Sequence, residues 1–358
     1  MIINRYIIDE ITKPMVATCT VLICIFASYT AAGYLADAVS GLLPLDAVLL
    51  MLLLKIAIAL EVLLPTTLYL SVVIALGRMY RDSEMIALAS CGASTSKILK
   101  PVIYLSILIA ILVASISLFV RPWAYEEIYQ LKAKAKSDFD ISRMEGGNFY
   151  EIKSNDLVIF AKKMNHPLNR GEQVFIRSQD GKTLRVISAK HVYQKTDDKS
   201  GVRVLLLKDG YVYEFTRRGE EGKITKFEQA TYLLAPKETI PVGYKRKAAP
   251  TPYLLRSDKL EDIAELQWRL STPLSTLLLA LLAVPLSRTT PRQGKFGKVV
   301  SAILIFAVYY NLTVVAKNWI EKDIVNAIPG IWWVPLLLGA LVLLLLWHQE
   351  AIFIRQRN

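Results

Sequence analysis

The chain has 358 residues and a formal net charge of +12; 53% of its residues are hydrophobic and 21% are charged. The mean hydropathy of +0.37 argues against a purely soluble protein, and the charge content argues against a chain embedded wholly in a membrane. The apolar content excludes intrinsic disorder, and 17 Gly and 3 Cys exclude collagen-like and disulfide-rich secreted chains. Because apolar and polar stretches are separated along the chain, the sequence predicts a membrane protein with one sizeable polar domain.

Six apolar runs flank one polar region. The runs lie at about 14–36, 45–76, 98–120, 270–286, 298–316 and 331–347. The first is too long for the apolar part of a signal peptide. The second would exceed the hydrocarbon thickness as one helix, and Lys55, Glu61 and Pro65 interrupt it, so we expect a short interfacial helix at about 46–58 and a spanning helix at about 61–78. The sequence therefore predicts an α-helical membrane protein with six transmembrane helices, three on each side of an inserted domain.

The inserted domain is expected to be all β. Its short stretches alternate apolar and polar residues, and Asp180-Gly181 and Asp209-Gly210 lie between such stretches as hairpin signals. We expect about seven to nine antiparallel strands in a sandwich or jelly roll, a helix at 126–136 and an extended return at 236–258. The predicted domains are an N-terminal transmembrane half (1–121), the β domain (122–262) and a C-terminal transmembrane half (263–358).

Lysine and arginine in the short loops predict the orientation. Six spans put both termini on one side, and that side carries most of these residues: Arg5, Lys13, Arg78, Arg81, Lys97, Lys100, Arg288, Arg292, Lys295, Lys298, Arg355 and Arg357. The opposite short loops carry only Lys317 and Lys322. Both termini are therefore expected in the cytoplasm and the β domain outside.

Motifs for catalysis are absent from the sequence. It has no G-x-x-x-x-G-K-[ST], no H-E-x-x-H and no G-x-S-x-G, and its three histidines are scattered. We therefore expect no enzymatic activity, metal or cofactor in this chain. Nucleic-acid binding is not expected either, because the basic residues lie outside the cytoplasm or beside the membrane.

A polar segment between the second and third spans is the most informative one. Residues 82–92 read as a short helix with Asp82 or Ser83 as N-cap and Glu84 in the first turn. It presents Met85 and Leu88 on one side. Permeases use such a helix to dock a cytoplasmic ATPase, although an ordinary amphipathic linker would have the same pattern.

Several segments carry a resemblance that covers the whole length of the chain. They are Met1-Ile2-Ile3-Asn4-Arg5-Tyr6, the segment 83–92, Leu266-Gln267-Trp268-Arg269-Leu270 with Pro273-Leu274-Ser275, and Val284-Pro285-Leu286-Ser287 followed by Pro291-Arg292-Gln293-Gly294-Lys295. With them the chain resembles the LptF/LptG (YjgP/YjgQ) family of lipopolysaccharide-export permeases. The last loop and the Trp268-Arg269 pair are more similar to the F subunit than to G.

The resemblance implies an inner-membrane permease subunit of a Gram-negative ABC transporter that takes lipopolysaccharide from the outer leaflet and passes it to a periplasmic bridge. It implies an LptG-like partner permease, an LptB-like ATPase dimer that holds the ATP and Mg²⁺, an LptC-like membrane protein and a periplasmic jelly-roll domain. Glu84 matches the acidic residue of the family's coupling helix, and the neighbouring docking residues would be Arg81, Ser83, Met85 and Leu88.

The physical requirements of such a cargo select further candidates. Lipid A carries phosphates and acyl chains, so its site needs cations at the outer membrane interface and apolar surface beside them. The candidate cations are Lys55, Arg121, Arg269 and Lys317, and the candidate apolar residues of the β domain are Phe149, Val158, Phe160 and Phe175. Snorkelling towards headgroups and an ordinary β core are the alternative explanations. Glu61 is expected to pair with Lys55 or with a partner subunit. A permease for lipoprotein or peptide, or a membrane-anchored periplasmic scaffold, are the alternative functions.

Overall fold

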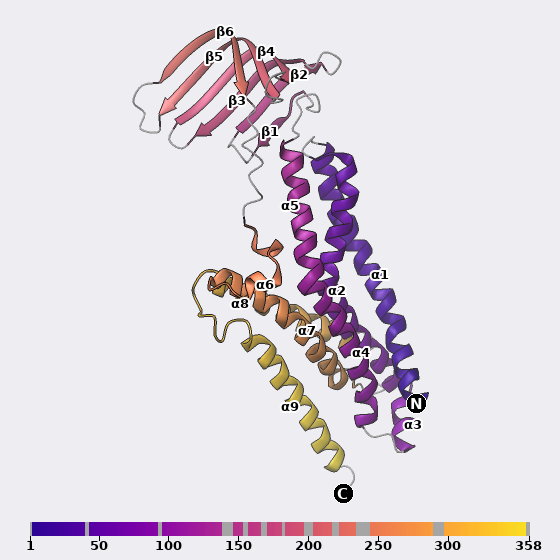
Figure 1. The fold of residues 1–358 in the computed structure, drawn as a ribbon. Helices are drawn as coiled ribbons and strands as arrows, with labels where there is room; N and C mark the ends of the chain where they lie inside the picture. Colours follow the sequence, from indigo (N-terminus) through magenta and orange to yellow (C-terminus); the bar gives the residue numbers. More distant parts are fainter. Residues whose placement is uncertain are drawn as a thin grey trace. The chain divides into compact units, whose positions relative to one another are not determined.

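The apolar runs form long helices in the computed structural model, which describes residues 2–39, 43–91, 95–137, 146–152, 157–165, 170–180, 183–196, 203–216, 222–233, 244–288 and 297–355 (Figure 1). The helices are α1 (Ile2–Val39), α2 (Leu45–Arg81), α3 (Glu84–Ser90), α4 (Thr95–Ser115), the π-helix η1 (Ile116–Val120), α5 (Arg121–Ser137), the 3-10 helix η4 (Arg246–Ala248), α6 (Thr251–Leu254), α7 (Leu260–Leu286), α8 (Gly297–Glu321) and α9 (Trp333–Arg355). Within the described residues, 5 helical segments are long and apolar enough to cross a membrane, and the apolar part of α9 is shorter. The chain is therefore a multi-pass membrane protein, and the count of six spans stays a prediction.

The second apolar run forms one helix, so the prediction of an interfacial and a spanning helix was wrong. α2 continues through Lys55, Glu61 and Pro65 for 37 residues, which is about 55 Å at 1.5 Å per residue. The two charged side chains do not break it because each has a partner: Lys55 lies 5.2 Å from the centroid of the Tyr125 ring, and Glu61 pairs with Arg121. The third span and the helix expected at 126–136 also join without interruption, over Lys97–Ala135.

Two compact units make up the chain. The first comprises Met1–Thr30, Leu52–Ile128 and Tyr244–Asn358, and the second comprises Ala31–Met51 and Tyr129–Gly243. The first unit contains most of the apolar helices, and the second contains the β-sheet. The predicted domain boundaries near 122 and 262 stay a prediction.

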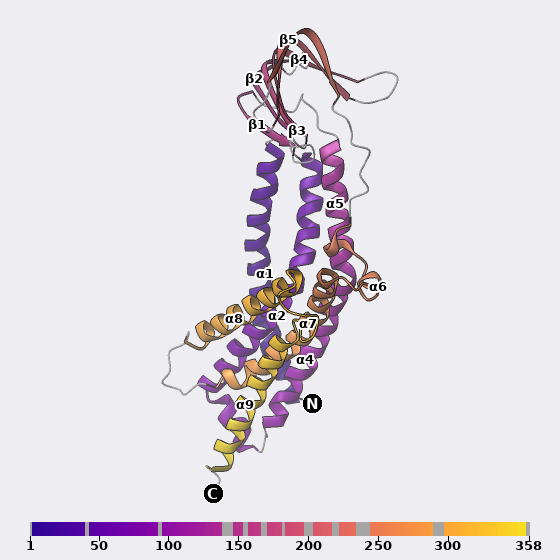
Figure 2. The same ribbon diagram turned by 90° about the vertical axis from the view of Figure 1, so that its left-hand side faces the viewer.

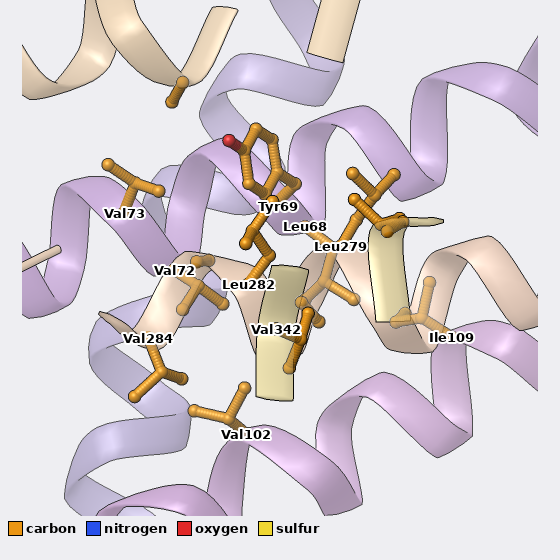
Figure 3. Packing of buried hydrophobic residues seen from close by; sticks show 14 of the residues in the cluster. Leu68, Tyr69, Val72, Val73, Val102, Ile109, Leu279, Leu282, Val284 and Val342 are labelled. Atoms are coloured by element: carbon orange, nitrogen blue, oxygen red, sulfur yellow. The ribbon is translucent and has the colours of Figure 1, made fainter. Parts of the chain in front are cut away.

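Helix α7 lies at the centre of the first unit and packs against α4, α8 and α9 (Figure 2). Its buried positions include small residues, among them Ala264, Ser271, Ser275, Ala280 and Ala283, which let neighbouring helix backbones approach closely. Larger side chains fill the surrounding space (Figure 3). They are Leu68, Tyr69, Val72 and Val73 of α2, Val102 and Ile109 of α4, Leu279, Leu282 and Val284 of α7, and Val342 of α9.

The second unit holds an antiparallel sheet of six strands that follow one another in sequence order. The strands are β1 (Phe149–Ile152), β2 (Leu157–Asn165), β3 (Arg170–Asp180), β4 (Thr183–Thr196), β5 (Arg203–Thr216) and β6 (Lys223–Leu233). This order is a meander. The described strands form one sheet rather than the two layers of the predicted sandwich. They number six, fewer than the seven to nine strands predicted. The hairpin expected at Asp180-Gly181 is confirmed, because Asp180 pairs with Thr183.

The second predicted hairpin, Asp209-Gly210, was wrong: both residues lie inside β5. Asp209 has a φ of 52°, and the burial alternation shifts by one residue there, since Leu207 and Gly210 are both buried. Val174 and Gly171 show the same spacing in β3, where Gln173 has a φ of 49°. The shift keeps the same face of each long strand buried. In the sequence, the break in the alternation at Asp209 makes the single strand β5 look like two strands joined by a turn.

Candidate functional site

Five charged side chains of the helices in the first unit meet in one buried cluster. They are Glu61 of α2, Arg121 of α5, Glu265 and Arg269 of α7, and Lys317 of α8, and their side chains are between 0% and 12% exposed. Removing such groups from water costs several kcal/mol each unless they are paired. We call these five residues the charge cluster.

Glu265 is the centre of the charge cluster. Its carboxylate oxygens lie 2.5 Å from Nζ of Lys317, 3.1 Å from Nη2 of Arg121 and 3.3 Å from Nε of Arg269. Arg121 also donates to Glu61 at 2.6 Å, and Ser117 donates to the other oxygen of Glu61 at 2.7 Å. The cluster thereby ties α2, η1, α5, α7 and α8 together.

Positive charge exceeds negative charge by one in the charge cluster, since three cations face two carboxylates. The aromatic ring of Trp268 lies beside this excess, with its centroid 5.1 Å from Nζ of Lys317 and 5.8 Å from the guanidinium of Arg121. Lys317 is the most exposed of the three cations, at 12%. An anion that reached the cluster would therefore meet Lys317 first.

Arg269 is fully buried and also holds the chain segment that returns to the first unit. Its guanidinium donates to the carbonyl oxygens of Ala249, Lys247 and Arg246 at 2.9, 3.2 and 3.4 Å. Thr251 of the same segment accepts from Arg269 at 3.1 Å and donates to the carbonyl of Leu118 at 2.8 Å. A planar guanidinium with several donors fits this role better than an ammonium group would.

The start of α7 has a second buried acid, Asp262. The hydroxyls of Tyr244 and Ser257 donate to its two carboxylate oxygens at 2.5 and 2.6 Å. Burial, followed by the bond to Asp262, raises the pKa of Tyr244 well above its usual range. The bond from the Tyr244 hydroxyl to Asp262 keeps the segment docked on α7.

A cavity between α2, α7 and α8 borders the charge cluster. The space between its walls is about 380 Å³ when its opening to the surroundings is counted. Its lining is apolar with a few hydroxyl groups and consists of Glu61, Val62, Pro65, Trp268, Ser271, Thr272, Ser275, Leu279, Phe306, Tyr309, Tyr310 and Thr313. The indole N–H of Trp268 is buried there and has no hydrogen-bond partner among the residues that the structure describes.

Helix α3 is the second candidate site. Ser83, at a φ of 61°, turns the chain sharply after α2, and Glu84 begins the helix. Met85 is buried at 3% in the core of the first unit, whereas Ile86 is 58% exposed. A seven-residue helix held by its inner face therefore presents a free outer face.

Comparison with known proteins decides the family. A family model described as "Lipopolysaccharide export system permease LptF/LptG" matches residues 5–348. The chain belongs to this family. It is 26% identical to the lipopolysaccharide export system permease protein LptF of Escherichia coli K12, over 98% of this chain and 96% of the relative, and it has the same identity and coverage with LptF of Shigella flexneri. The chain is thus a permease subunit of lipopolysaccharide export in the inner membrane and is not itself catalytic.

The four cations expected to bind lipid in this LptF/LptG-family chain lie close together. Arg121, Arg269 and Lys317 surround Glu265, and Lys55 shares the ring of Tyr125 with Arg121, which lies 5.8 Å from its centroid. Three of these cations already pair with carboxylates. Glu61, for which pairing with Lys55 or with a partner subunit was expected, pairs with Arg121 of the same chain. Pairing with a partner subunit stays a prediction.

The four apolar candidates of the β-sheet also share a face. Phe149, Phe160 and Phe175 lie in one row of paired residues, and Val158 lies two residues before Phe160. The rings of Phe149 and Phe160 stack at 4.6 Å. The opposite face carries the buried cluster of the sheet, including Ile159 and Ile176. The row therefore offers accessible apolar surface, with Phe149 exposed at 70%.

The predicted docking residues fall into two groups. Arg81, Ser83 and Glu84 are accessible, and Arg81 pairs with Asp82 at 3.1 Å. Met85 and Leu88 face the core instead, because the helix packs its apolar side inward, and Ile86 takes the exposed apolar position. Gly92 and the loop 291–295 lie outside the described residues.

Sequence reasoning missed Glu265. Its signal was present, because Glu265 and Arg269 are four residues apart on one helix, a spacing that places opposite charges side by side. It was overlooked because the fourth span was expected to begin at Leu270, whereas α7 begins at Leu260.

Proposed function

We propose that this chain is the LptF-like subunit of an ATP-driven exporter that takes lipopolysaccharide from the outer leaflet of the inner membrane. A separate LptB-like ATPase dimer would dock on α3, an LptG-like permease would complete the membrane part, and an LptC-like protein would receive the lipid. Both termini would lie in the cytoplasm and the β-sheet in the periplasm, as the lysine and arginine of the short loops favour. The sequence has no P-loop motif, which agrees with ATP hydrolysis on a partner ATPase rather than on this chain.

The observation that carries the docking part of the proposal is the geometry of α3. Its inner residue Met85 is buried while Glu84 at its start and Ile86 remain accessible. A short helix with one exposed apolar side chain and one partly accessible carboxylate, which accepts from the Tyr6 hydroxyl at 2.8 Å, suits a protein surface with a pocket and a basic rim. The E. coli relative is named a permease protein of the lipopolysaccharide export system, which fits a subunit that couples to a motor.

The charge cluster supports the cargo part of the proposal. Lys317 would contact an anionic headgroup, while Arg121 and Arg269, at 7% and 0% side-chain exposure, would hold the carboxylates in place. The cavity beside Trp268 offers apolar surface to an acyl chain, and the row Phe149, Phe160 and Phe175 would do so on the β-sheet. Positive charge in an apolar setting attracts phosphate strongly, because little water screens it.

The test replaces Glu84 with Ala in the complete complex reconstituted in proteoliposomes. The retained ATPase and the release of lipopolysaccharide to a periplasmic acceptor are measured. We expect both to fall by about tenfold or more, as for other interface residues that lose a charged hydrogen bond. The matched control is Asp258→Asn, which changes an exposed acidic residue between α6 and α7.

Normal ATPase binding and normal release in the Glu84→Ala complex would favour the scaffold function instead. The cargo is tested separately with a photo-crosslinking amino acid at Phe160. Capture of lipopolysaccharide is the expected result, and capture of peptide alone would favour a lipoprotein or peptide exporter.

A further inference from the structure

The first turns of α1 are fixed to the first unit. Ile7 and Ile11 are fully buried in its core, and Met15 is 8% exposed. Glu10, which lies between the two isoleucines, accepts from Nη2 of Arg78 in the last turn of α2 at 2.5 Å. Apolar packing and an ion pair therefore hold the beginning of α1 in a defined position.

Tyr6 connects this part of α1 with α3. It precedes Glu10 by one helical turn and lies on the same side of α1. Its hydroxyl donates to Oε2 of Glu84, the first residue of α3, at 2.8 Å. Figure 1 shows the N-terminus of the chain beside α3. Because Tyr6 is 41% exposed, the bond lies at the surface of the unit, where another protein could reach it.

The carboxylate of Glu84 depends on this bond for its orientation. α3 is held in place by Met85, buried at 3%, and by Leu88, which packs against the core. These contacts fix the helix but not the glutamate side chain, which has several rotamers of similar energy. Among the described residues, the Tyr6 hydroxyl is the hydrogen-bond partner of the Glu84 carboxylate. It therefore favours one rotamer and leaves Oε1 available to a second donor.

We infer that Tyr6 is a positioning residue that orients Glu84 towards a basic side chain of the docked ATPase. The inference rests on the proposed docking of an ATPase at α3. One carboxylate oxygen of Glu84 accepts from the Tyr6 hydroxyl, and the other is presented to an arginine or lysine of the partner. A side chain that is already held in its bound geometry loses less conformational freedom on docking, so the affinity is higher.

The experiment measures the affinity of the ATPase for the complete membrane part of the complex. The LptB-like ATPase is removed, labelled with a fluorophore and titrated back onto the membrane subunits in nanodiscs. The decisive variant is Tyr6→Phe, which removes only the hydroxyl. We expect Kd to rise by about three- to tenfold, the range for one lost hydrogen bond. The matched control is Tyr29→Phe, which alters a tyrosine of the same helix that is 80% exposed and should leave Kd unchanged.

The same substitution in a Glu84→Ala chain separates positioning from other roles. If Tyr6 acts through Glu84, Tyr6→Phe weakens docking in the native background and has no further effect once the carboxylate is gone. A direct contact of Tyr6 with the ATPase, or a purely structural role of its hydroxyl, would give the same loss in both backgrounds and would overturn the inference. A Tyr6→Phe complex with the same Kd as Tyr29→Phe would overturn it as well.

Failure of the proposed function gives a different result. If the unaltered complex binds no ATPase, or if Glu84→Ala binds it as tightly as the native chain does, docking at α3 is refuted and the inference falls with it. Docking that depends on Glu84 but is unchanged in Tyr6→Phe would refute the role of Tyr6 alone.

Discussion

Replacing Glu265 with Gln removes the carboxylate that three buried cations share. In the native chain Lys317, Arg121 and Arg269 lie 2.5, 3.1 and 3.3 Å from its oxygens. The excess positive charge of the cluster would rise from one to two, with Glu61 as its remaining carboxylate and Glu321 at 3.8 Å from Lys317. Removing one partner of a buried ion pair costs about 3–5 kcal/mol, because the remaining charge is uncompensated.

That free energy converts into a measurable thermal shift. Each kcal/mol corresponds to about 2–4 °C for a unit of 150–250 residues, so the midpoint of heat inactivation should fall by roughly 6–20 °C. The assay follows the folded fraction of the purified chain in detergent by size-exclusion chromatography after heating. The matched control is Glu261→Gln, one turn earlier in α7, whose side chain is 56% exposed and lies 3.5 Å from Arg246; an exposed pair of this kind contributes about 0–1 kcal/mol.

A second substitution shows whether charge is the cause. Adding Lys317→Gln to Glu265→Gln restores the original excess of one positive charge, so we expect the midpoint to recover by about half or more. The reasoning would be refuted by a Glu265→Gln midpoint equal to that of Glu261→Gln. It would also be refuted if the added Lys317→Gln lowered the midpoint further, since the cations would then stabilise the fold independently of Glu265.

Three other predictions concern positions where the structure leaves little freedom. Gly330 has a φ of 56°, and a Cβ there would lie 2.2 Å from Oε1 of Gln267. Backbone strain and overpacking in Gly330→Ala should together cost about 1–3 kcal/mol. The heat-inactivation midpoint should therefore fall by about 2–12 °C. Gly339→Ala, where a Cβ would meet only Leu278 at 3.8 Å, is its control and should leave the midpoint unchanged. Gly210→Ala should prevent the β4–β5 pairing, because a Cβ would lie 2.3 Å from the carbonyl oxygen of Ser188, and amide hydrogen exchange in both strands would report it as loss of protection. Arg269→Lys should release the segment 246–251 while keeping the charge, since an ammonium cannot bond three carbonyls in this geometry; faster hydrogen exchange at Thr251 is expected, and unchanged exchange would contradict the assigned role.

The membrane part of the fold could be read from the sequence because lipid imposes a simple rule: apolar stretches of sufficient length form helices. The errors arose where charges are paired. Lys55 and Glu61 looked like interruptions of a span. Lys55 contacts Tyr125 and Glu61 pairs with Arg121, and both partners lie about sixty residues or more further along the chain. No local sequence pattern shows such a contact.

The β-sheet was predicted in type but not in number of strands. Alternation of period two identifies a strand only while its register is constant. At Asp209 the burial pattern shifts by one residue, so β5 reads as two strands with an Asp-Gly turn between them. The shift depends on the neighbouring strands, since Gly210 pairs with both Ala189 and Phe227, and it could not be derived from the segment alone.

The candidate site, too, could be predicted from the sequence only in part. Sequence reasoning selected the cations Lys55, Arg121, Arg269 and Lys317 because charge at the edge of a span is costly, and the structure places them near one another. It could not distinguish a cation that holds the fold from one that meets a ligand. Burial differs between the two: Arg269 is fully enclosed and bonded to backbone carbonyls, whereas Lys317 keeps part of its surface. The role of Lys317 towards a ligand stays a prediction.

The unequal charge count of the cluster connects stability with cargo. A cluster with as many carboxylates as cations would stabilise the helices more, because an uncompensated charge at low dielectric destabilises the folded state. One more carboxylate near Lys317 would balance the charge of the cluster. Glu321, one helical turn from Lys317, lies 3.8 Å from its ammonium group, but it also lies 3.4 Å from Arg246 and is shared between the two cations. The positive charge that remains is a cost to the empty chain and an attraction for an anion, so a phosphate-bearing lipid would stabilise the occupied state by the same interaction that binds it. A permease must also release its cargo, and under the proposed function Glu265 would limit how tightly Lys317 holds a phosphate, because both anions would compete for one ammonium group.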